Sequence, residues 1–258
     1  MNLLKIEWIK ASNSVSFWIM IGLYILIVPL LLYFFNNFYV TVNEIEVEVS
    51  SLAQISADNF WSFLFYLTSY QLWIPVFVVI MNLSSDRNNQ LWKQHIIDGL
   101  SRNEVLLSKV LFIVLLSLAV TIYVGLTGFG FILFSQLEYS HAMWVPLFEA
   151  GSLFFLCHLA YIVLGFVINL IVKNTALTLI LFLSWAWFVE RIIRFIDKSN
   201  STDILPINSF NDLLQNPFIE LLGLGDSQLG LEAALISTMV WLLLLSSFSW
   251  YYFKRTDF

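Results

Sequence analysis

Long apolar runs alternate with short polar segments along the chain. Six windows contain no charged residue; five of them are 21 to 27 residues long, and Asn174–Val189 has 16. A helix needs about 20 residues to cross the hydrocarbon core of a bilayer. The short window reaches that length if its helix continues to about Asp197, because long charged side chains near a helix end extend toward the headgroups. We therefore predict an all-α integral membrane protein with six transmembrane helices in one domain, residues 1–258. The predicted spans cover residues about 15–36, 60–84, 107–135, 149–172, 174–197 and 232–253.

The most distinctive polar segment is the insert Asp86–Lys109, between the second and third apolar runs. Its apolar residues recur at helical spacing and the pattern breaks at Asp98-Gly99. These apolar residues are Leu91, Trp92, Ile96, Ile97 and Leu100. A short amphipathic helix of this kind lies on a membrane surface or docks into a groove of a partner. The polar insert is therefore the first candidate for an interaction site.

Other segments carry weaker signals. Residues 1–12 predict an amphipathic helix in the plane of the membrane, with its basic face toward the headgroups. Pro75 is expected to kink the second span. The alternation in residues 44–49 is typical of a strand, but isolated short strands are unstable, so its structure stays open. Asn216-Pro217 favours one or two short helices within the loop 199–231. In the third span, glycines at 125, 128 and 130 favour close helix packing.

Composition and charge fix the class of protein and its orientation. Hydrophobic residues make up 59% of the chain and charged residues 12%, whereas a soluble domain has about 25% charged residues. The single cysteine, Cys157, excludes an intrachain disulfide and a multi-cysteine metal site. Six spans put both termini on one side, and nine of the twelve Lys and Arg residues then lie on that side. Because basic residues accumulate in cytoplasmic segments, we expect both termini to be cytoplasmic.

Two groups of polar residues within the spans are candidate sites. His158 lies inside the fourth span, where a histidine is either functional or a neutral residue hydrogen-bonded to a neighbouring helix. Glu190, Arg191 and Arg194 end the fifth span, and Glu190 and Arg194 are spaced to share one helix face. That face either lines the outer mouth of a pathway or anchors an ordinary helix end at the headgroups.

Several chemistries leave no motif in the chain. There is no HExxH, no GxSxG and no GxxxxGK[ST], so the sequence indicates neither a zinc protease, a serine hydrolase nor a nucleotide-binding loop. Few ionisable residues lie in the middle of a span, which argues against an ion-coupled carrier. We expect no enzymatic activity, metal, cofactor or nucleic-acid partner for this chain. Any uphill transport would need an energy source on another protein.

The whole pattern resembles the permease subunit of a type-2 ABC exporter. The resemblance rests on the N-terminal helix before an aromatic-rich span, the six spans and the basic C-terminal tail. It rests above all on the insert LWKQHIIDGLSRNEVLLSKVL, in which six residues match the string found after the second span of such subunits. They are Trp92, Gly99, Ser101, Arg102, Ser108 and Lys109.

The resemblance implies a coupling helix, about residues 88–99, seated in a cleft of a separate cytoplasmic ABC ATPase that binds ATP and Mg²⁺. Leu91, Trp92, Ile96 and Ile97 would fill the cleft, and Lys93, Asp98 and Arg102 would set the register at its rim. A second permease copy or a paralogue would complete the pathway near spans 2 and 5, capped by outer helices around Phe218. The expected location is the inner (plasma) membrane of a bacterial cell.

Two other functions stay open. The chain could be a non-transporting membrane scaffold or assembly subunit tied to an ATPase, or an autonomous channel or carrier. The substrate cannot be predicted, since relatives of this kind handle peptides, lipids, drugs and polysaccharides.

Overall fold

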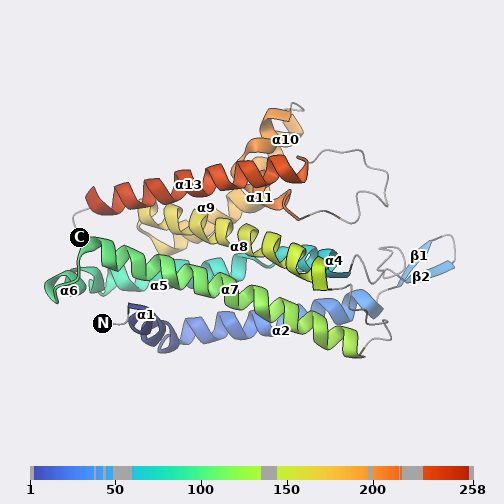
Figure 1. The fold of residues 1–258 in the computed structure, drawn as a ribbon, viewed down its shortest axis with the longest axis horizontal. Helices are drawn as coiled ribbons and strands as arrows, with labels where there is room; N and C mark the ends of the chain where they lie inside the picture. Colours follow the sequence, from blue (N-terminus) through green and yellow to red (C-terminus); the bar gives the residue numbers. More distant parts are fainter. Residues whose placement is uncertain are drawn as a thin grey trace.

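The structure is a computed structural model that describes residues 3–37, 39–42, 45–48, 60–134, 144–196, 200–214, 216 and 229–255. It is an elongated bundle whose long helices run along one common axis (Figure 1). The helices on the first half of the chain are α1 (Leu3–Ser12), α2 (Val15–Asn37), α4 (Phe60–Ser69), α5 (Trp73–Asn88), α6 (Leu91–Ile97) and α7 (Arg102–Phe134). Those on the second half are α8 (Trp144–Val172), α9 (Thr175–Ser184), the π-helical turn η2 (Trp185–Val189), α10 (Glu190–Ile196), the 3₁₀ turn η3 (Asn200–Ile204), α11 (Pro206–Asn211) and α13 (Leu231–Arg255).

The long apolar helices make this a multi-pass membrane protein. Within the described residues, five helical units are long and apolar enough to cross a bilayer: α2, α7, α8, the continuous unit α9–η2–α10, and α13. The pair α4 and α5 passes the same test when taken together, with a bend of 45° between the two helices. The predicted six spans correspond to counting this bent pair as one crossing.

The broken second span differs from the predicted kink in position. The helix stops at Ser69 and restarts at Trp73, so the interruption precedes Pro75 rather than centring on it. A proline ring clashes with the carbonyl four residues earlier, and that residue here is Gln71. The break therefore falls where the proline forbids helical continuation, while Pro75 itself sits in the first turn of α5, where its missing N–H is tolerated.

Helix α8 forms the centre of the bundle. It packs against α4, α5, α7, α9 and α13, and it is the most buried of the five long units, whereas α13 is the least buried. Glycines allow the closest approaches. A Cβ on Gly165 would lie 2.5 Å from Val76 of α5, and one on Gly128 would lie 2.5 Å from Leu64 of α4. Of the three glycines predicted to pack closely, Gly128 does so and Gly130 faces open space.

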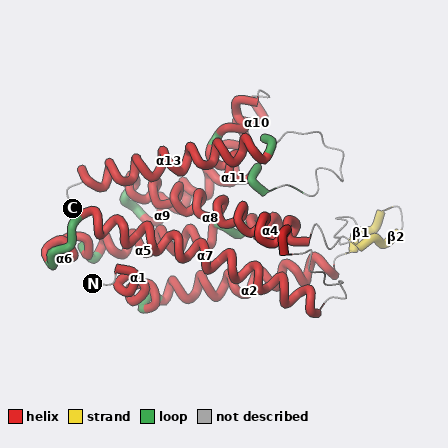
Figure 2. Tube along the Cα trace, viewed as in Figure 1, coloured by secondary structure: helices red, strands yellow, loops and turns green. Residues whose placement is uncertain are grey.

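The two ends of the bundle differ in character. One end, here called the terminal end, carries α1, α6, the turn between α8 and α9, and the last residues of α13 (Figure 1). The other end carries the only strands of the described chain, β1 (Tyr39–Val42) and β2 (Ile45–Glu48), which pair antiparallel with Val42 opposite Ile45 (Figure 2). The prediction of a purely helical protein therefore needs this one exception, which falls on the residues with strand-like alternation.

The loop between the last two spans contains short helices, but earlier than predicted. Both η3 and α11 precede Asn216. The predicted helices after Asn216-Pro217, including Phe218, lie outside the described residues.

Candidate functional site

A seven-residue helix, α6, lies within the polar insert where the sequence pattern predicts one. Gln90 precedes it with a φ of 53°, and Gly99 follows it with a φ of 97°. Glycine adopts this left-handed conformation without a steric cost. The helix therefore ends at the Asp98-Gly99 interruption, and it is shorter than the expected range 88–99.

The third span begins inside the insert, immediately after this turn. The backbone N–H of Ser101 donates to the Glu104 carboxylate at 2.7 Å, and the N–H of Glu104 donates to the Ser101 hydroxyl at 3.3 Å. This reciprocal capping box satisfies two N–H groups that the first turn of a helix leaves unpaired. Helix α7 is thus a rigid continuation of the insert into the membrane.

The predicted docking residues of the insert divide into an outward and an inward set. Lys93, Ile97 and Asp98 are exposed, and Leu91, Ile96 and Arg102 are half-buried. Ile97 is 82% exposed, whereas Trp92 is only 4% exposed. The Trp92 ring packs edge-to-face against Phe253 of α13, with ring centroids 5.4 Å apart. The expectation that Trp92 fills a partner's cleft is therefore wrong, because this indole belongs to the core of its own chain.

Two arginines attach the insert to helices that are distant in sequence. The Arg87 guanidinium donates to the backbone carbonyl and to the side-chain oxygen of Asn169 on α8, both at 2.9 Å. Arg102, expected at the rim of a docking surface, donates to the carbonyl of Lys254 at the end of α13 at 2.6 Å. A cation at a helix C-terminus is favourable. Movement of α6 is thereby tied to α8 and α13.

Four charged side chains from α1, α5 and α7 form a cluster in which Glu7, Asp86 and Lys109 are buried and Lys10 is half-buried. Lys109 pairs with Glu7 at 2.6 Å and also with Asp86. Lys10 pairs with Glu7 at 2.7 Å and with Asp86 at 3.2 Å. The Ser108 hydroxyl donates to Glu7 at 3.1 Å. We call Glu7, Lys10, Asp86 and Lys109 the ionic cluster.

The ionic cluster contains two acids and two bases, and the bases favour the ionised form of Glu7. Burial alone would raise the pKa of Glu7, but Lys109 and Lys10 outweigh it and leave this pKa below its usual value. The predicted basic face of α1 is accordingly wrong in orientation: Glu7 is buried and Lys10 turns inward, while Trp8 and Ile9 are exposed. Helix α1 is attached to the bundle by charge.

The sequence contains a signal for the ionic cluster. Glu7 is an acid inside an otherwise basic N-terminal segment, and Asp86 and Lys109 are opposite charges at the two ends of the polar insert. Charges at the ends of neighbouring spans are expected to pair because unpaired charges at that depth are costly.

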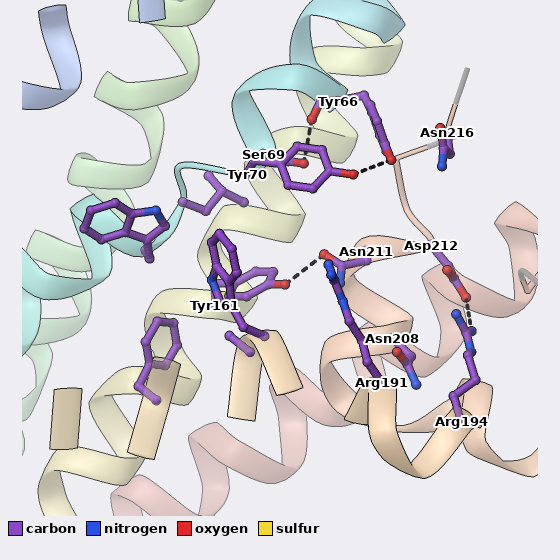
Figure 3. Close-up of a pocket in the computed structure, with 15 residues that line it drawn as sticks. Tyr66, Ser69, Tyr70, Tyr161, Arg191, Arg194, Asn208, Asn211, Asp212 and Asn216 are labelled. Carbon is purple, nitrogen blue, oxygen red and sulfur yellow. Dashed lines mark hydrogen bonds and ion pairs between the residues drawn. The ribbon is translucent and has the colours of Figure 1, made fainter. Parts of the chain in front are cut away.

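A second candidate site is a cavity of about 320 Å³ lined by residues of α4, α5, α8, α10 and α11 among others (Figure 3). Three interruptions of regular structure border it: the break at 70–72, the turn η2 and the short helix α11. Aromatic side chains form much of its wall. They are Tyr66, Tyr70, Trp73, Tyr161, Phe182 and Trp187.

Of the predicted pathway residues, Arg191 and Arg194 line this cavity and Glu190 does not. Glu190 is buried and accepts hydrogen bonds from the Trp185 indole at 2.5 Å and from the Asn208 backbone N–H at 2.9 Å. Glu190 therefore connects η2 to α11 and does not open into the cavity.

Arg194 connects α10 to the segment that contains η3 and α11. Its guanidinium pairs with Asp203 of η3 at 2.6 Å and with Asp212 at 3.4 Å. Among the described residues, the expected ion pair between Glu190 and Arg194 is not formed, because each side chain finds a partner on η3 or beside α11. Burial raises the pKa of Asp212 to about 6, against the opposing effects of the Leu229 N–H and of Arg194.

Arg191 is the exception in this group. It lines the cavity and is exposed, and it has no hydrogen bond or ion pair with any residue in the described part of the chain. Its side chain runs along the cavity toward Asn211 and Tyr161, which are hydrogen-bonded to each other at 2.8 Å (Figure 3).

The other intramembrane candidate, His158, is completely buried on α8. Among the described residues, neither ring nitrogen has a hydrogen bond of regular geometry, and the backbone of Ser117 on the neighbouring helix α7 is the polar group that acts on the ring. The ring stacks near Phe154 at 6.2 Å. The adjacent Cys157 is also fully buried. Nowhere in the described ranges do three or more His, Cys, Asp or Glu side chains gather in a way that could hold a metal ion.

Comparison of the sequence with protein-family models and with curated proteins finds no match.

Proposed function

We propose that this chain is the permease subunit of an ATP-driven ABC exporter, and that α6 docks onto a separate cytoplasmic ATPase. The feature that carries the proposal is α6 itself. It lies at the extreme of the terminal end (Figure 1) and exposes an isoleucine at 82%, with Lys93 and Asp98 also exposed. An apolar residue ringed by charges is typical of a protein-binding surface.

The attachments of α6 support a role in transmitting force. Helix α6 connects α5 to α7, and the ion pair of Asp86 with Lys109 holds the adjoining parts of α5 and α7 together. Glu7 adds α1 to the same unit, and Arg87 adds α8. A push on α6 would therefore move several membrane helices together, as a transporter driven by an external ATPase requires.

Charge supports the proposed orientation. Nine of the twelve basic residues belong to elements at the terminal end. By the positive-inside rule this end faces the cytoplasm, where an ATPase would meet α6. In this proposal the membrane is a bacterial plasma membrane, and a second permease copy or a paralogue completes the pathway.

The docking test uses a charge placed on the exposed face of α6. The tagged chain is purified from its native membranes in a mild detergent, and companions are identified by mass spectrometry and by ATP hydrolysis. Ile97→Asp should lower recovery of a P-loop ATPase at least about tenfold, since a central apolar contact is worth about 2 kcal/mol or more. Ile204→Asp, the same change at an exposed residue of η3, is the matched control.

The outcomes separate the candidate functions. Full recovery of the ATPase with Ile97→Asp would refute docking through α6. If no ATPase accompanies even the unmodified chain, an autonomous channel or carrier is favoured. If an ATPase docks but its hydrolysis in lipid discs responds to no peptide, lipid or drug, the chain is a scaffold or assembly subunit.

A further inference from the structure

We propose that the cavity beside η2 binds an amphiphile with an anionic head, a carboxylate or a phosphate. The head lies at Arg191 and the apolar body lies along the aromatic wall. The inference deepens the proposed function, in which this ligand is the transported substrate, but the binding itself does not depend on an ATPase.

The backbone around the cavity is the first argument. The break between α4 and α5, the turn η2 and helix α11 converge on one space, although the break lies more than a hundred residues before the other two in sequence. Irregular backbone within a membrane protein persists where it is buried in protein or lines a water-filled cavity. Isolated π-helical turns also occur frequently at functional sites.

The charges around the cavity are the second argument. Arg194 is paired with Asp203 and Asp212, and the Glu190 carboxylate is occupied by Trp185 and Asn208. Each of these groups has an ion-pair or hydrogen-bond partner within the protein. Arg191 is left as the lining charge without a partner among the described residues. A guanidinium presents a fork of N–H donors that matches the oxygens of a carboxylate or a phosphate.

The wall opposite Arg191 is the third argument. Aromatic rings line the cavity, and the hydroxyls of Tyr66 and Tyr70 are hydrogen-bonded to each other at 2.7 Å (Figure 3). The cavity volume of about 320 Å³ lies at the lower end of ligand pockets. The aromatic rings of this largely polar lining can contact an apolar chain or ring, and the guanidinium of Arg191 fits one anionic group.

Binding is tested on the purified chain in neutral maltoside micelles, by thermal unfolding. The probes are dodecyl phosphate and dodecyltrimethylammonium, which share a tail and differ in head charge. Dodecyl phosphate at roughly a hundred times its Kd should raise Tm by roughly 5 °C, because ligand binding to the folded state stabilises it. Dodecyltrimethylammonium should not raise it.

Three variants assign the effect to Arg191. Arg191→Gln should abolish the rise in Tm, and Arg191→Glu should transfer it to dodecyltrimethylammonium. Arg255→Gln removes an exposed guanidinium at the terminal end and should retain the full rise, which controls for micelle charge. Equal shifts in the unmodified chain and in Arg191→Gln, or no shift in the unmodified chain, would overturn the proposal and leave Arg191 as an interfacial anchor.

A further arm identifies the source of the anionic head. The chain is placed in phosphatidylcholine discs with or without phosphatidylglycerol. A stabilisation by phosphatidylglycerol that requires Arg191 indicates a membrane lipid, and stabilisation by dodecyl phosphate alone indicates a free amphiphile; both support the site. Because no arm contains an ATPase, failure of the proposed exporter function would leave this result standing.

Discussion

At the scale of single residues, buried charge decides how the N-terminal helix is held. The side chains of Glu7, Asp86 and Lys109 are all less than 5% exposed. Burying a charge is costly unless it is paired, and removing one partner of a buried pair exposes that full cost. Helix α1 therefore depends on the ionic cluster more than its apolar residues indicate.

Glu7→Gln should lower the free energy of unfolding by about 3–5 kcal/mol, because Lys109 is left buried with reduced compensation. The double change Glu7→Gln with Lys109→Met should recover much of the loss. Both variants are compared by reversible unfolding in mixed micelles. A loss below about 1 kcal/mol for Glu7→Gln would show that α1 is held by other contacts.

The same acid predicts a pH dependence. Since the pKa of Glu7 is lower in the folded chain than its usual value of 4.5, its stabilising effect is fully present above that value. It is lost as the pH falls through the lower, folded pKa. Lys10, Lys109 and Asp86 face Glu7. Below pH about 4.5, the Tm of the unmodified chain should fall more steeply with decreasing pH than the Tm of Glu7→Gln. Parallel curves of Tm against pH for the two proteins would contradict this.

At the scale of elements, the sequence predicted those features whose cause is local. The helical spacing of Leu91 to Ile97 and the glycine at 99 specify α6 and its end without help from the rest of the chain. The break before Pro75 was predicted only as a kink. Its location follows from a steric rule, but the cavity beside it depends on η2 and α11, which approach only in the folded chain.

Helix packing around α8 gives a direct test with two glycines. Gly165→Ala should destabilise the chain by about 1–3 kcal/mol, because the new Cβ would lie 2.5 Å from Val76. Gly130→Ala is the matched control: nothing lies within 4 Å of its Cβ, so the higher helix propensity of alanine should leave stability unchanged or raised by up to about 1 kcal/mol. Equal effects in unfolding experiments would contradict the close contact of α8 with α5.

At the scale of the whole molecule, hydropathy was sufficient to predict a helical multi-pass membrane protein. It was not sufficient to place side chains. The sequence predicted that Trp92 faces a partner, because helical spacing does not say which neighbour covers a helix face. The residue that packs against Trp92 is Phe253, which is 161 positions away in the chain. Glu190 and Arg194 were paired by spacing, whereas η3 and α11 supply their actual partners. Long-range contacts of this kind cannot be read from a local pattern.

Cys157, the only cysteine, is completely buried in α8, which makes the unmodified chain silent toward thiol reagents. A cysteine introduced at an exposed position would thus be the single reactive thiol, with no native cysteine to remove. With the terminal end in the cytoplasm, Ile97→Cys should react with a membrane-impermeant maleimide only after cells are permeabilised, and Ile204→Cys should react on intact cells. The reverse pattern would invert the proposed orientation. Because the Cys157 thiol is buried, labelling two introduced cysteines is enough to measure the orientation of the protein in the membrane.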